Sequence, residues 1–174
     1  FMLFVAKKKV SPNVTHLSCS SDGQVHIIGD LHGQLRDLLH ILDEAGTPSP
    51  TNKYIFNGDF VDRGSCSTEV LMLLFSFHLA WPESVFLNRG NHEDHAICSQ
   101  PPPPNGCGGF ANEMKSKYDD LMYSMCVEVC FPSTVVIIVD YILKLIFILS
   151  HFLPAPSYVR TLGFSTPASR YNHR

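Results

Sequence analysis

Three short apolar runs, at residues 25–28, 54–56 and 85–87, alternate along the chain with two segments that favour helices. The runs have the length and composition of buried strands. The segment 34–45 has leucines at positions i, i+3, i+4 and i+7, which is the spacing of one helix face. The segment 68–80 predicts a second helix. Because crossovers between parallel strands are right-handed, the pattern predicts a βαβαβ core with a parallel sheet.

Residues at the ends of the two predicted helices support these assignments. Gly46 directly follows the first helical segment and predicts a C-terminal cap. Ser65 or Ser67 is expected to cap the N-terminus of the second helix, because a serine hydroxyl can accept a hydrogen bond from a free backbone N–H group.

Downstream of the third apolar run the chain becomes less regular. Residues 100–109 contain four consecutive prolines and three glycines and predict a loop. A third amphipathic helix is expected over 110–129, followed by two buried strands at 134–139 and 144–150. Residues 154–174 are rich in Pro, Ser and Thr, and we expect them to be disordered or poorly packed.

The apolar stretch 135–149 leaves a membrane-spanning helix as an alternative. It is 15 residues long and contains Asp140 and Lys144, whereas a span needs about 20 mostly apolar residues. A charged side chain at the centre of a bilayer costs about 2.5–3.5 kcal/mol. We therefore interpret this stretch as strands and expect no membrane partner.

Composition restricts the classes of function. The 174 residues are enough for one folded domain, and the net charge of −3 gives no reason to expect a nucleic-acid partner. The six cysteines form no C-x-x-C pair. Reduced thiols are typical of a cytoplasmic or nuclear protein, which is the location that we expect.

Each apolar run is followed at once by a glycine and a side chain that can bind a metal. The blocks are GDLHG at 29–33, GDFVDRG at 58–64 and GNHE at 90–93. Functional groups of open parallel sheets gather beyond the carboxyl ends of the strands. One Gly-Asp turn is ordinary loop chemistry, but three of them at the spacing of strand–helix units predict a shared site.

Four residues of these blocks are candidate metal ligands. Asp30 and His32 can chelate one ion from a tight turn, and Asp59 can bridge two ions because a carboxylate has two oxygens. Asn91 offers a neutral amide oxygen. This mixture of ligands suits Mn, Fe or Zn, and two such divalent ions can hydrolyse a phosphate ester. The chain has no dinucleotide-binding fingerprint or P-loop, so no organic cofactor is expected.

Three further residues of the blocks are candidate catalytic groups. The guanidinium of Arg63 matches the edge of a phosphate, and His92 can protonate a leaving alkoxide. Asp62 can hold the His92 ring in the required tautomer. A structural ion pair between Asp62 and Arg63 remains the alternative.

The blocks GDLHG, GDFVDRG and GNHE resemble the three signature motifs of the phosphoprotein phosphatase family of Ser/Thr protein phosphatases, within the calcineurin-like metallophosphoesterase superfamily. The resemblance extends from about Pro12 to Tyr118. It implies an α/β (α+β) fold, a partial metallophosphoesterase β-sandwich with the βαβαβ core flanked by helices. We expect an N-terminal lead-in at 1–23, a partial catalytic domain at 24–151 and an irregular or disordered tail at 152–174.

The resemblance also implies a function, namely hydrolysis of phosphoserine and phosphothreonine monoesters in phosphorylated protein substrates. Asp30 and His32 would bind a first metal, Asp59 would bridge, and Asn91 would bind a second metal. A two-metal-activated hydroxide would attack phosphorus, with His92 as the general acid. Any regulatory subunit is left unspecified.

The resemblance ends in the C-terminal part, where the family has two more metal-binding histidines and a second phosphate-binding arginine. His151 follows an apolar run and is a further candidate ligand, although Phe152 and Leu153 stand where the family has two glycines. The alternative is a histidine at the end of a core strand. We therefore expect a C-terminally truncated or divergent member. A catalytically impaired, phosphatase-like binding module and another kind of metallophosphoesterase remain as alternative functions.

Overall fold

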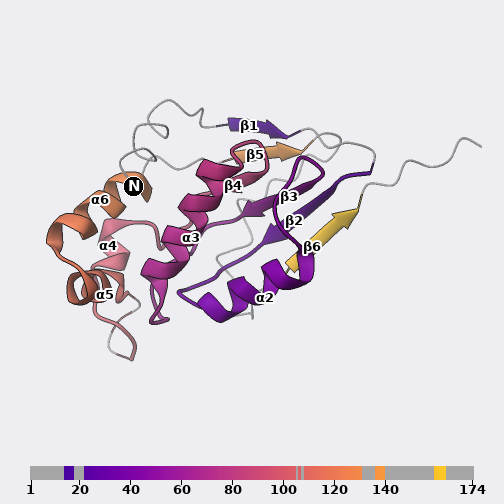
Figure 1. The fold of residues 1–174 in the computed structure, drawn as a ribbon. Helices are drawn as coiled ribbons and strands as arrows, with labels where there is room; N and C mark the ends of the chain where they lie inside the picture. Colours follow the sequence, from indigo (N-terminus) through magenta and orange to yellow (C-terminus); the bar gives the residue numbers. More distant parts are fainter. Residues whose placement is uncertain are drawn as a thin grey trace, which may run out of the picture.

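The computed structural model describes residues 14–17, 22–104, 106, 108–130, 136–139 and 159–163. Its main sheet has four strands in the order β4-β3-β2-β6 (Figure 1). These strands are β2 (Gln24–Ile28), β3 (Asn52–Phe56), β4 (Val85–Leu87) and β6 (Val159–Gly163). The first three are parallel to one another, and β6 is antiparallel to β2.

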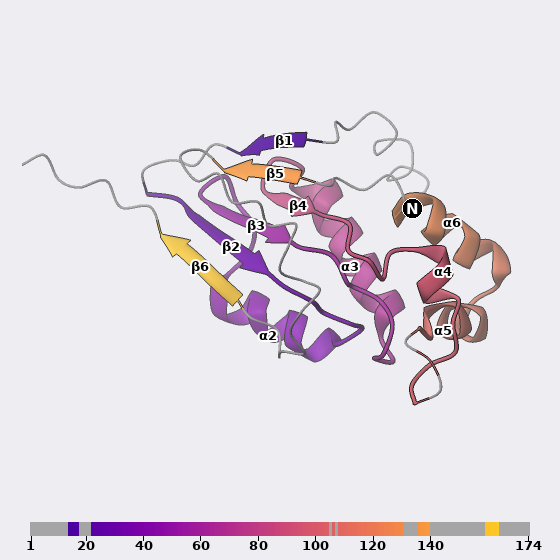
Figure 2. The same ribbon diagram turned by 180° about the vertical axis from the view of Figure 1, so that it is seen from behind.

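The predicted βαβαβ core is confirmed. Helix α2 (Leu35–Ala45) connects β2 to β3, and α3 (Ser67–Ala80) connects β3 to β4. The strand order advances in one direction from β2 to β4, so two right-handed crossovers place both helices on the same face of the sheet. Figures 1 and 2 show α2 and α3 together on that face.

Alternating side chains of the strands belong to two hydrophobic cores. Ile28, Tyr54 and Phe56 are fully buried in the larger core with residues of α2 and α3. Ile55, between two of them in sequence, lies in a smaller core with Leu17 of β1 (Val14–Leu17). Strand β1 pairs in parallel with β5 (Val136–Val139) as a second, two-stranded sheet. The sheet is therefore covered by helices on one face and by β1 on the other, as expected for a partial sandwich.

The helical region after β4 differs from the prediction. In place of one helix over 110–129, the structure has α5 (Phe110–Lys117) and α6 (Asp120–Cys130). Asp119 lies at the break, and its side chain accepts a hydrogen bond from the Met122 N–H group at 2.7 Å. An aspartate that caps a new helix was the sequence signal for the break.

A short helix, α4 (His95–Cys98), was not predicted. Its first turn is capped by Asp94, whose side chain accepts from the Ala96 N–H group at 2.9 Å. In both ribbon views α4, α5 and α6 gather at the end of the molecule opposite β6. No helix of the described residues is long and apolar enough to cross a membrane.

Two strands lie outside the elements that the sequence predicted. Strand β1 is in the lead-in 1–23, and β6 is in the expected irregular tail 152–174. Strand β6 pairs with β2 along its whole length, from Val159 opposite Ile28 to Gly163 opposite Gln24. The expectation of an irregular tail was wrong for residues 159–163, because a strand at a sheet edge is stabilised by pairing that local composition does not reveal. The predicted strand 134–139 is present as β5, and 144–150 lies outside the described residues.

The two predicted helix caps have different outcomes. Gly46 ends α2 with a φ of +80°, a conformation that favours glycine, as predicted. No side-chain hydrogen bond from Ser65 or Ser67 caps α3. Glu113 of α5 takes this role, since its carboxylate accepts from the N–H groups of Ser67 at 3.1 Å and Thr68 at 2.9 Å.

Candidate functional site

The loops that follow β2, β3 and β4 meet beyond the carboxyl ends of these strands. The N–H groups of Leu31 and His32 donate to the carbonyl oxygen of Asp59 at 3.0 and 2.9 Å. The N–H group of Gly33 donates to the carbonyl oxygen of Phe60 at 2.8 Å. The first two blocks of the sequence are thus joined through the backbone, and the Asp59 peptide is their point of contact.

The second and third blocks approach each other through glycines. A Cβ atom on Gly58 would lie 2.2 Å from the Gly90 nitrogen, and one on Gly90 would lie 2.2 Å from Asp59 Oδ1. Gly58 also has a φ of +92°. No residue with a side chain fits at this contact unless the two loops move apart.

The backbone of the site is strained at functional positions. Four residues with side chains have left-handed φ values, which are +42° at His32, +53° at Asp59, +71° at Asp62 and +64° at Arg63. This conformation costs about 1–2 kcal/mol for each such residue. It persists only where surrounding contacts impose it, which is typical of functional sites.

Three of the four predicted metal ligands come together. Asp30, His32 and Asp59 each offer a ligand atom, and these atoms lie within 4.8 Å of one another. His32 Nδ1 donates to the carbonyl oxygen of Val61 at 2.8 Å, which leaves Nε2 as a lone-pair acceptor. His32 Nε2 is buried, lacks a hydrogen-bond partner in the described structure and lies 3.8 Å from Asp30 Oδ2. A histidine that donates to a carbonyl through one nitrogen and presents the other is arranged as a metal ligand.

The fourth predicted ligand, Asn91, lies against the Asp59 carboxylate. Its amide oxygen faces the two carboxylate oxygens; turned over, the amino group would donate to Oδ2 at 3.0 Å and to Oδ1 at 3.3 Å. Oxygen atoms that face each other in this way repel, and a cation between them turns the repulsion into attraction. Together with the unpartnered His32 nitrogen, this geometry fits a divalent cation.

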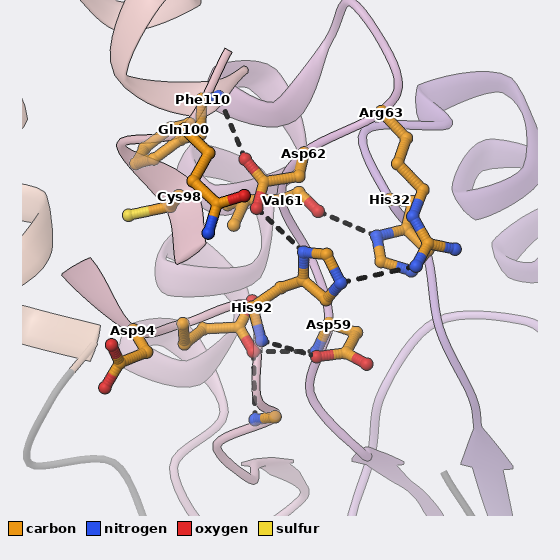
Figure 3. Close-up of polar contacts among 12 residues, drawn as sticks. His32, Asp59, Val61, Asp62, Arg63, His92, Asp94, Cys98, Gln100 and Phe110 are labelled. Carbon is orange, nitrogen blue, oxygen red and sulfur yellow. Dashed lines mark hydrogen bonds and ion pairs between the residues drawn. The ribbon is translucent and has the colours of Figure 1, made fainter. Parts of the chain in front are cut away.

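A second cluster adjoins these ligands and contains the three candidate catalytic residues. His92 Nδ1 donates to Asp62 Oδ2 at 2.8 Å, and the N–H group of Phe110 donates to Asp62 Oδ1 at 2.9 Å (Figure 3). On the other side of the ring, Arg63 Nη2 lies 3.3 Å from His92 Nε2. The predicted contact of Asp62 with His92 is therefore present. The described residues contain no ion pair between Asp62 and Arg63, so that alternative is not supported.

The two clusters are connected directly. The N–H group of His92 donates to Asp59 Oδ1 at 2.9 Å, so the backbone of the candidate acid touches the candidate bridging ligand. His32 and His92 also pack edge to face, with ring centroids 4.6 Å apart. His151 lies outside the described residues, and its assignment as a ligand stays a prediction.

Glu93 is a site residue to which sequence reasoning gave no role. Its side chain is buried, with 3% of the residue exposed, and accepts from the N–H groups of Asp59 at 2.7 Å, Phe60 at 2.7 Å and Gly90 at 2.9 Å. Its place at the end of the GNHE block was the available signal. Nothing in the local sequence shows that this carboxylate reaches a loop 34 residues earlier.

Burial and neighbouring charges shift the pKa values of residues in the site. Burial, followed by the charge of Asp59, raises the pKa of Asp30 above 3.8 and that of Glu93 to about 7. Burial lowers the pKa of His32 below 6.5, against the hydrogen bond to Val61. His32 is thus biased toward the neutral form that binds metals. A divalent cation would favour ionised carboxylates and so oppose the rise for Asp30.

Known proteins resemble this chain in sequence. A family model described as calcineurin-like phosphoesterase matches residues 23–169. Serine/threonine-protein phosphatase rdgC of Drosophila melanogaster is 51% identical over 110 residues, which are 63% of this chain and 16% of that protein. Human serine/threonine-protein phosphatase 5 is 48% identical over 106 residues, which are 61% of this chain and 20% of that protein.

A solved phosphatase structure is similar to this chain in fold. It is a protein serine/threonine phosphatase from Saccharomyces cerevisiae, described as similar to human phosphatase PP5, with a TM-score of 0.73 and 31% sequence identity. The match covers 80% of this chain and 42% of the yeast chain. This family implies divalent metal ions, and the cluster of Asp30, His32 and Asp59 is the candidate site for them. The chain belongs to the calcineurin-like phosphoesterase family.

Proposed function

We propose that this chain carries the catalytic site of a metal-dependent protein serine/threonine phosphatase, which hydrolyses phosphoserine and phosphothreonine monoesters. One observation carries the proposal: a buried Asp62–His92 pair with Arg63 beside it adjoins the ligand cluster of Asp30, His32 and Asp59. The arrangement brings metal ligands, a proton donor and a phosphate-binding group together on neighbouring loops. The names of the relatives support the same substrate class.

Asp30, His32 and Asp59 would hold one divalent ion, and Asp59 with Asn91 would hold a second, from the set Mn, Fe or Zn. Such a pair of ions, when bound, supplies Lewis acidity at the phosphate and a water deprotonated at neutral pH. The unpartnered His32 Nε2 and the facing oxygens of Asn91 and Asp59 support this fit.

Arg63 would bind the phosphate of the substrate. A guanidinium donates two parallel hydrogen bonds to two phosphate oxygens, which fixes both the position and the orientation of the group. Its Nη2 atom lies 3.3 Å from His92 Nε2, so a phosphate held by Arg63 has its leaving oxygen close to the candidate proton donor.

Arg63 Nη2 can only donate, so His92 Nε2 accepts from it in this structure. With Arg63 bound to the phosphate, the protonated His92 ring would donate its Nε2 proton to the leaving serine or threonine oxygen. Asp62 accepts from Nδ1 and stabilises the protonated ring before the transfer. Asp62 is itself held in place by the N–H group of Phe110, so its carboxylate cannot turn away from the imidazole. The N-terminus of α5 therefore helps to orient the acid.

The proposal is tested with purified chain, Mn²⁺ and two substrates, an aryl phosphate monoester and a phosphoserine peptide. His92→Asn keeps a hydrogen-bond donor for Asp62 but cannot act as the acid, and we expect its kcat to fall about 10²–10⁴-fold. Asp59→Asn should lose both Mn²⁺ binding and turnover. Equal turnover by the wild type and both variants would overturn the proposal. Faster hydrolysis of an aryl diester than of the monoester would favour another kind of phosphoesterase.

A further inference from the structure

We infer that Glu93 is a positioning residue whose carboxylate holds the Asp59 backbone in place and thereby sets the affinity of the site for divalent cations. The inference rests on the proposed function, because it takes Asp59 as a metal ligand. It gives a role to the one acidic residue of the GNHE block that the proposed mechanism does not use.

Both oxygens of Glu93 are engaged by backbone amides of two different loops. Oε2 accepts from the N–H groups of Asp59 at 2.7 Å and Gly90 at 2.9 Å, and Oε1 accepts from Phe60 at 2.7 Å. Asp59 and Phe60 belong to the loop after β3, and Gly90 belongs to the loop after β4. Glu93 therefore fastens the second block to the third.

A displacement of the Asp59 backbone would move the candidate metal ligands. Its backbone has a left-handed φ of +53°, which a residue with a side chain keeps only under constraint. Its N–H group is bound by Glu93, and its carbonyl oxygen accepts from Leu31 and His32. A displaced Asp59 peptide would move its own carboxylate and also release the turn that carries Asp30 and His32.

Glu113 provides a matched control for the loss of such a carboxylate. It too accepts backbone N–H groups from a distant segment, those of Ser67 and Thr68, but at the N-terminus of α3. Its described hydrogen bonds reach none of the four candidate ligands. A general destabilisation would follow from either substitution, whereas a change in metal affinity is expected only at Glu93.

The experiment measures the Kd for Mn²⁺ of the whole chain by the electron paramagnetic resonance signal of the free ion. We expect Glu93→Gln to weaken binding about 10–100-fold, because the amide replaces one acceptor by a donor that faces backbone donors. Glu113→Gln should change the Kd less than about threefold, since it does not touch the ligand loops. Circular dichroism establishes that each variant is folded. Glu93→Asp serves if Glu93→Gln does not fold; its carboxylate is one methylene shorter, and weaker binding is expected again.

Each outcome has a distinct meaning. Wild-type affinity in a folded Glu93 variant overturns the positioning role while leaving the metal site intact. Equal weakening in Glu93→Gln and Glu113→Gln also overturns it, because the effect is then general. A wild-type chain that binds no Mn²⁺ overturns the proposed metal site itself.

Discussion

In two regions of the molecule, a glutamate carboxylate accepts backbone N–H groups from a distant segment, but the two carboxylates have different surroundings. At the strand ends, Glu93 accepts three backbone N–H groups beside the charge of Asp59, and burial raises its pKa to about 7. At the start of α3, Glu113 accepts two backbone N–H groups beside Lys117, which lies 2.8 Å away. Burial alone would raise the pKa of Glu113, but the hydrogen bonds from Lys117 and these amides lower it. Glu93 thus lies beside another carboxylate, whereas Glu113 is paired with the Lys117 ammonium.

The difference indicates what each region is built for. The strand ends gather the carboxylates of Asp30, Asp59 and Glu93, whose repulsion a cation would relieve. The same loops also hold four residues with left-handed φ angles. At the contact of α3 with α5, the Lys117 ammonium pairs with the carboxylates of both Glu69 and Glu113, at 2.7 and 2.8 Å. Substitutions at the strand ends should therefore change binding and chemistry, and those at the helices should change stability alone.

The largest effect is expected for Asp62→Asn. The asparagine amide would donate to His92 Nδ1 in place of accepting from it, which leaves the ring neutral and a poor acid at Nε2. We expect kcat for an aryl phosphate to fall about 10²–10⁴-fold, with the Kd for Mn²⁺ unchanged. Steady-state kinetics and a Mn²⁺ titration check this. A variant that turns over at the wild-type rate would contradict the assignment of His92 as the acid.

Gly90→Ala should follow, with effects on both stability and binding. The new Cβ atom would lie 2.2 Å from Asp59 Oδ1 and 2.4 Å from the Asp59 nitrogen, so the loops must separate. We expect a loss of about 1–3 kcal/mol in the free energy of unfolding, measured by urea denaturation, and weaker Mn²⁺ binding.

Gly46→Ala is the matched control for that substitution. At Gly46 the nearest atom to a Cβ is 3.6 Å away, but φ is +80°, so the cost is strain alone, about 1–2 kcal/mol. Its Kd for Mn²⁺ should equal that of the wild type. Equal loss of Mn²⁺ affinity in both alanine variants would show that the strand ends are not distinct from the helix ends.

Glu113→Gln is expected to have a smaller effect, and one that depends on pH. The pKa of Glu113 is lower in the folded chain than its ordinary value of 4.5. Its ionised form therefore stabilises the fold above pH 4.5, and this stabilisation is lost as the pH falls through the lowered folded pKa. The variant should lose about 1 kcal/mol at pH 7, as for a lost helix cap.

Measurements of stability over a range of pH distinguish the wild type from the Glu113→Gln variant. The difference in free energy of unfolding between wild type and Glu113→Gln should shrink below pH 4.5. Urea denaturation from pH 3 to pH 7 measures it. A difference that stays constant over this range would show that the Glu113 charge has no part in capping α3.

The smallest effect is expected for Lys115→Met. Lys115 pairs with Asp120 at 2.8 Å, but both side chains are largely exposed to solvent. An exposed pair contributes about 0–1 kcal/mol, so we expect the free energy of unfolding to change by less than about 0.5 kcal/mol. A larger loss would show that the helical region depends on its surface charges as well as on the α3 cap.

The sequence predicted the parts of the molecule in which a residue acts on its neighbours along the chain. The three apolar runs, the parallel core and the convergence of Asp30, His32 and Asp59 followed from local patterns and the handedness of crossovers. The break between α5 and α6 was missed although Asp119 signalled it.

The remaining features depend on contacts between distant segments. Glu93 and Glu113 act across 33–46 residues through backbone amides, and a glutamate carries no mark of which amide it will reach. Strand β6 is defined by its pairing with β2, more than 130 residues earlier in the chain. Such contacts are fixed by the folded topology, and local propensity does not reveal them.

Diffraction from crystals of the chain grown with Mn²⁺, recorded at an energy where manganese scatters anomalously, tests the central claim most directly. We predict two anomalous peaks about 3.5–4 Å apart, one contacted by Asp30, His32 and Asp59 and the other by Asp59 and Asn91. Peaks elsewhere on the molecule, or ordered side chains of these four residues with no peak between them, would contradict the account.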